Sequence, residues 1–342
     1  MVESTFRGMK EPITALCLRE VDLLFRPFLH RKINFSSRLV MTRLMQIEES
    51  IEEKLRYYTA RLPHQIGLII AEPVAVNESA AAGPVCRRGF VGGENLRAWR
   101  RLCRVVHAGN CRIAAQLCHA GMLRQNDNAI GPSGIDPLTK ECRGETMTRA
   151  RIREVVQAFG AAAALARQIG FDAVEIQGGQ DFLIHQFLCR ETNRRHDEYG
   201  GDAVARTRFA CEVIHAVRKA VGRRFPVIFC YSFGGSSRRL VSTPAELAAI
   251  LRLLCEAGVD IFACRGEGAL EPAFSGSPLS AAGWTRLLTQ RPVITESGAE
   301  VPGFSLRRLA YGLQSGEYDM VAVGRTLLSD VEWGSKVRRG DI

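Results

Sequence analysis

Eight short apolar runs, each followed by a longer amphipathic segment, constrain the fold of this chain more than any other feature. The longer segments carry apolar residues at three- and four-residue spacing, which predicts helices over residues 152–168, 203–221, 244–257 and 304–315. Continuous apolar runs are typical of parallel strands that are buried on both faces. Eight β-then-α units therefore predict a closed (β/α)8 TIM barrel of the α/β class. The predicted strands are residues 39–41, 67–71, 112–117, 173–176, 227–231, 260–264, 292–295 and 320–323.

A doubly wound open sheet is the alternative fold. Its dinucleotide-binding form carries Gly-x-Gly-x-x-Gly after the first strand, and that pattern is missing here. The 342 residues allow two average domains or one large barrel, and no linker rich in Pro, Gly or Ser divides them. We expect an N-terminal extension over residues 1–22 and one barrel over residues 23–342.

The composition is that of a globular protein, with 46% hydrophobic and 24% charged residues. No apolar run approaches the roughly 20 residues of a membrane span, and the N-terminus lacks the apolar block of a secretory signal. We therefore expect a cytoplasmic protein. The net charge of +10 comes from 40 Arg and only 6 Lys. Because the arginines are spread in pairs without a cluster among aromatic residues, they predict solvated faces rather than a nucleic-acid site.

The eleven cysteines form no Cys-x-x-Cys pair, and their number is odd. Several fall within apolar stretches, so we expect reduced core thiols rather than disulfides or a metal site. The cysteines in such stretches are Cys103, Cys111, Cys211, Cys230 and Cys264.

In a barrel of this kind the chemistry lies at the carboxyl ends of the strands. The third strand leads into residues 116–121 and a loop of about 30 residues, and loops of that length commonly bind substrate. After the fourth strand, Gly178 and Gly179 allow either the close approach of a ligand or merely a tight turn. After the last strand, Gly324 and Arg325 are suited to a phosphate, although Arg325 could instead pair with Asp330.

Four ordered blocks of sequence resemble the old yellow enzyme family of FMN-dependent oxidoreductases. The most specific block is FLIHQFL at residues 182–188 with TNRR at 192–195 and DEYGG at 197–201, similar to the family's YLIHQFL…NRRTDEYGG. The other blocks are LFRP at 24–27 with SRLVM at 37–41, QLCHAG at 116–121, and VGR at 323–325. The resemblance covers residues 23–340 and implies FMN at the barrel mouth, with NADH or NADPH as the reductant.

The resemblance also implies roles for individual residues. Backbone at Thr42 and Ala71 would contact the isoalloxazine, and the Gln116 amide would pair with its pyrimidine edge. The FMN phosphate would lie on Ser297, Gly298, Gly324 and Arg325. As partners we expect a small organic substrate, no nucleic acid and no membrane. A homo-oligomer is compatible with the sequence, which does not decide the oligomeric state.

The chain departs from the family at several reactive positions. Gln177 and Gln180 stand where ene-reductases carry a His with a second His or Asn, and an amide cannot become cationic. Phe182 replaces the proton-donating tyrosine, so a proton would come from Tyr57, Tyr58 or water. Most notably, Cys230 replaces an Arg that in the family lies beside flavin N1 and C2=O, where positive charge stabilises the reduced cofactor.

Further departures lie at the first strand and in the QLCHAG block. Arg43 and Met45 replace the family's Pro and its redox-tuning residue, and Met122 replaces an Arg. We interpret the chain as an FMN-dependent oxidoreductase with an atypical active site. The alternative is a barrel without productive flavin that acts as a non-redox enzyme or a binding protein.

Overall fold

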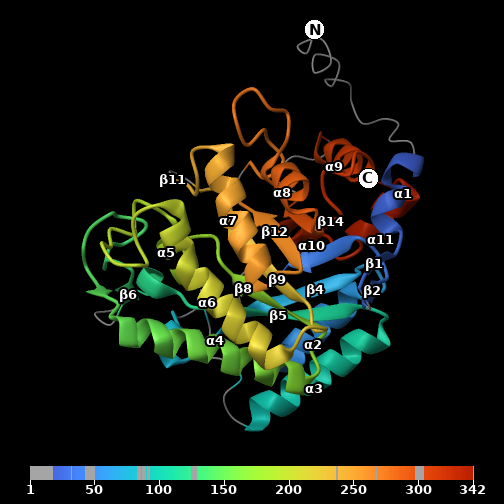
Figure 1. The fold of residues 1–342 in the computed structure, drawn as a ribbon. Helices are drawn as coiled ribbons and strands as arrows, with labels where there is room; N and C mark the ends of the chain where they lie inside the picture. Colours follow the sequence, from blue (N-terminus) through green and yellow to red (C-terminus); the bar gives the residue numbers. More distant parts are fainter. Residues whose placement is uncertain are drawn as a thin grey trace.

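The computed structural model describes residues 18–31, 33–42, 51–82, 86, 90, 93–124, 129–235, 238–266, 268–296 and 304–341. Eight parallel strands close into a barrel, which confirms the predicted fold (Figure 1). In barrel order they are β3 (Leu39–Thr42), β4 (Leu68–Ala75), β5 (Arg112–Cys118), β8 (Ala173–Gln177), β9 (Val227–Ser232), β12 (Ile261–Arg265), β13 (Val293–Glu296) and β14 (Met320–Val323).

Helices follow the strands along the chain and cover the outside of the barrel (Figure 1). The longer ones are α2 (Ile51–Arg61), α3 (Gly93–Ala108), α4 (Arg149–Ile169), α6 (Ala203–Val221), α7 (Pro244–Ala257), α8 (Ala281–Thr289) and α9 (Phe304–Gln314). The shorter ones are α1 (Leu18–Phe25), η1 (Glu78–Ala80), η2 (Gly121–Leu123), α5 (Leu183–Leu188), α10 (Arg325–Ser329) and α11 (Trp333–Arg339). The described helices include none that is long and apolar enough to span a membrane.

Local capping explains several of the helix boundaries. The Thr243 side chain accepts a hydrogen bond from the Glu246 N–H at the start of α7, and Pro244 occupies the first turn. Gly170 and Gly258 end α4 and α7 in the left-handed conformation, which glycine adopts at least cost. Two of the predicted helices, α6 and α7, therefore begin and end at the expected residues.

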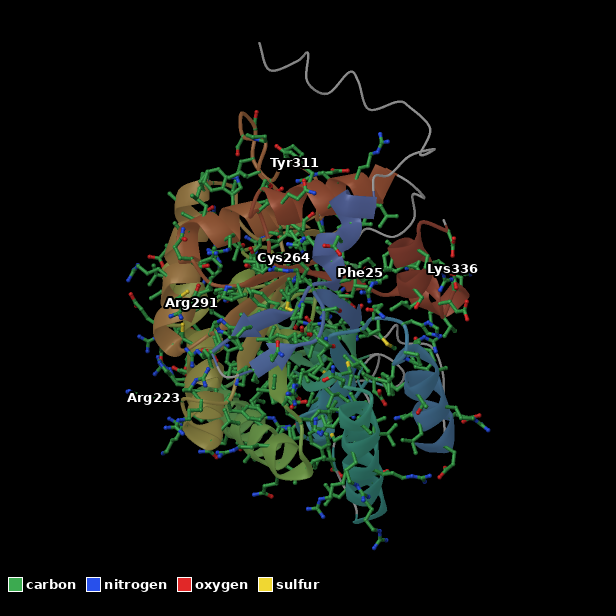
Figure 2. All side chains as sticks on the ribbon, turned by 90° about the vertical axis from the view of Figure 1, so that its right-hand side faces the viewer. Phe25, Arg223, Cys264, Arg291, Tyr311 and Lys336 are labelled. Carbon is green, nitrogen blue, oxygen red and sulfur yellow. A yellow bond between two sulfur atoms is a disulfide. The ribbon has the colours of Figure 1, made fainter. Side chains whose placement is uncertain are left out.

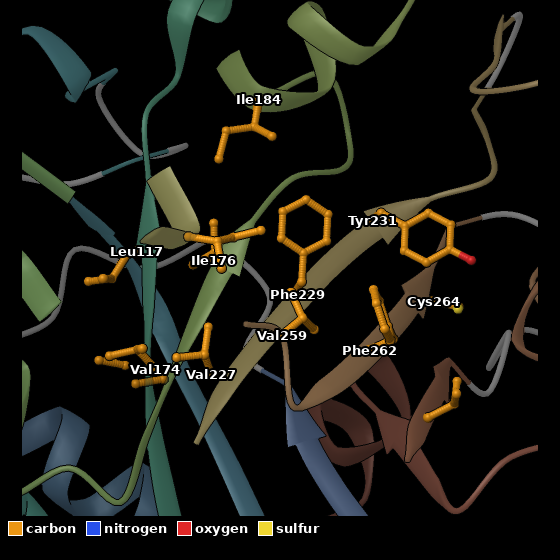
Figure 3. Packing of buried hydrophobic residues seen from close by; sticks show 14 of the residues in the cluster. Leu117, Val174, Ile176, Ile184, Val227, Phe229, Tyr231, Val259, Phe262 and Cys264 are labelled. Atoms are coloured by element: carbon orange, nitrogen blue, oxygen red, sulfur yellow. The ribbon is translucent and has the colours of Figure 1, made fainter. Parts of the chain in front are cut away.

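Side chains alternate between the barrel interior and the helical layer along each strand. A small apolar cluster fills the interior and includes Phe35 from the β1–β2 hairpin (Phe28–His30 and Ile33–Phe35). The larger cluster packs between strands and helices, and Figure 3 shows Ile176, Phe229 and Phe262 of three neighbouring strands in that layer. Figure 2 shows Cys264 deep inside the molecule, whereas Arg223 and Arg291 lie at its edge. The interior cluster also contains Val40, Leu68, Ile70, Ala114, Ala173, Ile228, Cys230, Ile261, Ala263, Ile294, Met320 and Ala322.

Several arginine side chains donate hydrogen bonds to backbone carbonyls. Arg195 donates to the carbonyls of Pro132 and Met147 at 2.9 and 2.7 Å, which ties two ends of the long loop after β5 to the segment after α5. Arg61, Arg143, Arg206 and Arg218 also donate to the carbonyls of two or more residues each. The expectation that the arginines lie on solvated faces is therefore wrong for Arg61, Arg195, Arg206 and Arg218, whereas Arg143 is exposed. A five-donor guanidinium can satisfy carbonyls that loops leave unpaired.

One prediction about the cysteines is also wrong. Cys86 and Cys118 form a disulfide, although they are 32 residues apart. Cys103, Cys111, Cys230 and Cys264 are free and buried, as expected. The spacing of the cysteines could not predict the bridge, because it depends on the chain after β4 folding back onto the end of β5. There the Val76 N–H donates to the Cys118 carbonyl, and the Ala120 N–H donates to the Ala80 carbonyl.

Candidate active site

The carboxyl ends of the eight parallel strands meet at one mouth of the barrel, and most of the predicted site residues lie there. Thr42 ends β3, Gln177 ends β8, and Gly324 follows β14. Gln116 lies in β5, where it pairs with Glu175 of β8, and Cys230 lies in β9, where it pairs with Gln177. Both side chains are buried. Ala71 lies within β4, and its side chain belongs to the outer cluster. Ser297 and Gly298 lie outside the described residues.

Gln116 takes part in a buried group of polar side chains that spans three strands. Its Nε2 donates to Glu175 Oε1 at 2.6 Å, and Arg265 Nη2 donates to Glu175 Oε2 at 2.8 Å. Glu175 is fully buried, and the Arg265 side chain is 6% exposed. One carboxylate of β8 thus positions an amide donor from β5 and a guanidinium from β12 at the mouth of the barrel.

The residues of this buried group shift one another's pKa values. Burial is the largest single effect on the pKa of Arg265 and would lower it, but Glu175, Cys230 and Glu296 together outweigh burial and raise that pKa well above its usual range. Burial raises the pKa of Glu175, and Arg265 and the Gln116 amide oppose that rise. Burial also raises the pKa of the Cys230 thiol well above its usual range, so this side chain stays neutral. Arg265 is therefore the cation of this buried group.

Gln177 and Gln180 form a second, shallower polar pair. The Nε2 of Gln177 donates to Oε1 of Gln180 at 3.3 Å, and the Gln180 N–H donates to Ser232 Oγ at 3.0 Å. Gln177 is buried and Gln180 is exposed, with φ of +52° at Gln180 and +62° at Asp181. The structure thus brings together the two amides that the sequence predicts for substrate binding, and places one of them in solvent.

The two glycines between these amides are required for packing between strands. A Cβ on Gly178 would lie 2.5 Å from Cζ of Phe229, and one on Gly179 would lie 2.6 Å from the Ser232 nitrogen. Both contacts are shorter than a real Cβ tolerates. The sequence allows either a ligand site or a tight turn at these glycines. The contacts with β9 are sufficient to explain them as a tight turn.

Phe182 and Tyr58 are buried, whereas Tyr57 is partly buried. Phe182 is buried in an apolar cluster with the Cys86–Cys118 disulfide and Ala80. The Tyr58 hydroxyl is buried and donates to Glu72 Oε2 at 2.8 Å. The Arg61 guanidinium lies over the Tyr57 ring, 3.6 Å from its centroid.

Residues of the family-like signature hold the long loop after β5. The Gln186 side chain donates to the carbonyls of Ala120 and Asp181 and accepts from the Met122 N–H. Arg195, described above, holds the far end of the same loop. Gln186 and Arg195 of the signature thus fix the position of the loop at the mouth of the barrel.

The phosphate end of the predicted site is described only in part. Gly324 precedes α10, and Arg325 begins this short helix with an exposed side chain. Asp330, the alternative partner suggested by sequence, pairs with Lys336 at 2.9 Å. The geometry leaves the phosphate role of Arg325 as a prediction.

Glu175, Arg265 and Ser232 were not among the residues that the sequence pointed to. Arg265 follows directly after the apolar run 260–264, and an arginine at the carboxyl end of a barrel strand is a recognisable signal. Glu175 interrupts the fourth apolar run, where a charge needs a partner. Which residue provides that partner depends on packing across three strands, which spacing does not reveal.

His119, in the QLCHAG block, predicts a pH dependence of folding. It is 1% exposed, its Nδ1 accepts from the Gly121 N–H at 3.0 Å, and burial, with smaller effects of Arg151 and Arg124, lowers its pKa to about 3. Between pH 6.5 and about 3 the unfolded chain binds a proton that the folded chain refuses, so stability falls as pH falls. This residue should cost about 2 kcal/mol of stability between pH 7 and pH 5.

Urea denaturation at both pH values measures this effect. His119→Asn keeps an acceptor for Gly121 but cannot titrate, so its loss of stability over this range should be about 2 kcal/mol smaller than that of the unmodified protein. An equal loss in the two proteins would show that His119 is not held neutral.

Comparisons with known proteins agree with this geometry. The sequence model of the NADH:flavin oxidoreductase / NADH oxidase family matches residues 23–341. An NADH oxidase of Thermoanaerobacter brockii is 30% identical over an alignment of 327 residues that covers 89% of this chain and 49% of that protein. An NADPH dehydrogenase of Bacillus subtilis (strain 168) is 29% identical over an alignment of 321 residues that covers 90% of this chain and 91% of the relative.

Solved structures show the same fold. Morphinone reductase superposes with a TM-score of 0.77 at 22% identity, covering 93% of this chain and 89% of its own. The chain spans about half the length of the NADH oxidase that it matches. The chain belongs to the NADH:flavin oxidoreductase / NADH oxidase family, which confirms the resemblance to the old yellow enzymes.

Proposed function

We propose that the chain is an FMN-dependent oxidoreductase that transfers hydride between NADH or NADPH, FMN and a small organic substrate. The observation that carries this proposal is the buried group of Gln116, Glu175 and Arg265 at the mouth of the barrel. Within the described residues, Arg265 Nε is buried and has no hydrogen-bond partner. A buried donor without a partner is costly, and the acceptor-rich pyrimidine edge of a flavin would satisfy it. The residues present therefore suit FMN.

The residues that would hold FMN form two groups. Gln116 and Arg265 would bind the pyrimidine edge, while Gly324 and Arg325 would provide the described part of the phosphate site. FMN, when bound, supplies hydride transfer, which no amino-acid side chain can perform. The protein orients the ring through donors that Glu175 fixes in place.

The substrate step differs from simple enone reduction in this proposal. Gln177 and Gln180 can donate hydrogen bonds to a substrate oxygen, but without the charge assistance of a protonated histidine. Phe182 has no exchangeable proton, and the apolar cluster around it leaves the position dry. Dehydrogenation, oxidative demethylation or another reaction that needs no strong acid at this position suits these residues better.

The visible absorption spectrum of the purified protein, before and after addition of FMN, tests the proposal. Retained FMN that NADH or NADPH bleaches without oxygen is the expected result. A colourless protein that does not retain added FMN would contradict it and would favour a non-redox use of the barrel. Bound FMN that neither nicotinamide reduces would contradict the redox step alone.

Arg325→Ala tests the phosphate assignment. A charge-assisted hydrogen bond contributes about 1.5–3 kcal/mol, so the dissociation constant for FMN should rise roughly ten- to hundredfold. Arg252→Ala removes an exposed arginine that pairs with Glu256 on α7, and it should leave FMN binding unchanged. Equal FMN affinity in the two variants would refute the role of Arg325. Fluorescence titration with FMN measures both values.

A further inference from the structure

The mouth of the barrel contains a cation in a position that the sequence did not predict. The family carries an arginine at the end of the fifth strand, and this chain has Cys230 there. We propose that Arg265, on the neighbouring strand β12, takes over the role of that arginine and supplies the positive charge beside the flavin pyrimidine ring. This inference rests on the proposed function and identifies one residue that sets the redox properties of its cofactor.

Strand register places the Arg265 side chain across β9. Cys230 pairs with Ala263 of β12 on one side and with Gln177 of β8 on the other. Arg265 pairs with Ser232, one inward position above Cys230, and Glu175 pairs with Ile228, one inward position below it. Because Arg265 Nη2 reaches Glu175 Oε2 at 2.8 Å, the guanidinium crosses the inner face of β9 at the level of Cys230.

The small side chain at position 230 makes this crossing possible. Cys230 is fully buried, and a thiol occupies little of the space that an inward arginine would fill. Its raised pKa keeps it neutral, so it does not neutralise the guanidinium. The small, neutral Cys230 on β9 thus leaves room for the Arg265 cation of the neighbouring strand β12.

Glu175 aims the two donors at the same ligand edge. Its Oε1 accepts from Gln116 and its Oε2 accepts from Arg265, so one carboxylate holds both the amide and the guanidinium. The pyrimidine edge of a flavin presents carbonyl and ring-nitrogen acceptors next to an N–H donor. Arg265 Nε, buried and without a partner among the described residues, is a donor available to these acceptors. Positive charge at that point stabilises reduced FMN, which carries an additional negative charge there.

Two opposite substitutions test the inference through the reduction potential of bound FMN. Arg265→Gln removes the cation and should weaken binding of reduced FMN about tenfold or more relative to oxidised FMN. For a two-electron couple, tenfold corresponds to a potential lower by about 30 mV. Glu175→Gln removes the neutralising carboxylate and should raise the potential. Equilibration with redox dyes measures both shifts without any substrate turnover.

A matched control removes a partly buried arginine of α6 that forms its ion pair at the opposite end of β12. Arg218 pairs with Asp260, just before β12, at 2.6 Å. Arg218→Gln should destabilise the protein and leave the potential of bound FMN unchanged. A shift in this variant as large as that in Arg265→Gln would mean that the potential reports general loosening of the barrel, and it would overturn the inference.

The outcomes separate the inference from the function on which it rests. If the unmodified protein does not bind FMN, both fail. If FMN binds and is reduced but Arg265→Gln and Glu175→Gln leave the potential unchanged, or shift it in the same direction, the inference fails and the proposed function stands. If Arg265→Gln does not fold, the double variant with Glu175→Gln avoids an unpaired buried carboxylate. Its potential should be lower than that of Glu175→Gln alone, and an equal potential would overturn the inference.

Discussion

Asp260→Ala should lower the free energy of unfolding by about 3–5 kcal/mol, the cost typical of breaking a buried ion pair. Asp260 is 1% exposed at the amino-terminal end of the barrel, away from the mouth. Its carboxylate accepts from Arg218 Nη2 at 2.6 Å and from the Val227 N–H at 2.9 Å, and it pairs with Arg31 at 2.6 Å. Alanine would leave the buried Val227 N–H and the Arg218 guanidinium without this acceptor. Urea denaturation at pH 7 measures the loss.

Glu256→Ala is the matched control for Asp260→Ala. It removes a carboxylate that pairs with Arg252 on the exposed face of α7, and exposed pairs of this kind contribute about 0–1 kcal/mol. A loss of less than about 1 kcal/mol in Asp260→Ala as well would show that the network around Asp260 contributes no more than a surface pair.

Reduction of the Cys86–Cys118 disulfide should lower the free energy of unfolding by about 4 kcal/mol. The bridge joins residues 32 apart, and closing a loop of that length removes this much conformational freedom from the unfolded chain. The measurement is urea denaturation with and without a thiol reductant, together with the mass change on alkylation of the unfolded protein. An unreduced protein that takes up alkylating reagent at both cysteines would show that the bridge does not form.

The double variant Cys86→Ser with Cys118→Ser is the control for the reductant. It should be less stable than the unmodified protein by a similar amount, and reductant should not destabilise it further. A similar effect of reductant on this variant would mean that the reductant acts elsewhere on the protein.

The barrel could be predicted from the sequence because its strands are apolar runs and its helices have regular spacing and clear caps. All eight runs correspond to barrel strands, and the boundaries differ by a few residues, most at β4, which continues to Ala75. Strand ends also identified Gln116 and Gln177 as mouth residues, since parallel strands must bring their carboxyl ends together.

The interactions of the mouth could not be predicted in the same way. The Gln116–Glu175–Arg265 group depends on which inward positions of β5, β8 and β12 lie at one level, and this depends on the stagger of the closed barrel. The disulfide depends on the path of the chain after β4. The role of Gly178 and Gly179 could not be predicted either, because it depends on how closely β9 packs against them.

The arginines that hold backbone carbonyls have a consequence for behaviour in alkaline solution. A lysine in the place of Arg195 would provide a single ammonium group, which loses its proton near pH 10 and with it most of its attraction for a carbonyl. A guanidinium keeps its proton throughout the range in which proteins function. The chain has 40 Arg and 6 Lys, and guanidinium groups such as that of Arg195 hold its loops through hydrogen bonds to carbonyls. These groups stay charged in alkaline solution. We therefore expect alkaline unfolding of this protein to result from ionisation of its tyrosine and cysteine side chains, and not from loss of the arginine–carbonyl hydrogen bonds.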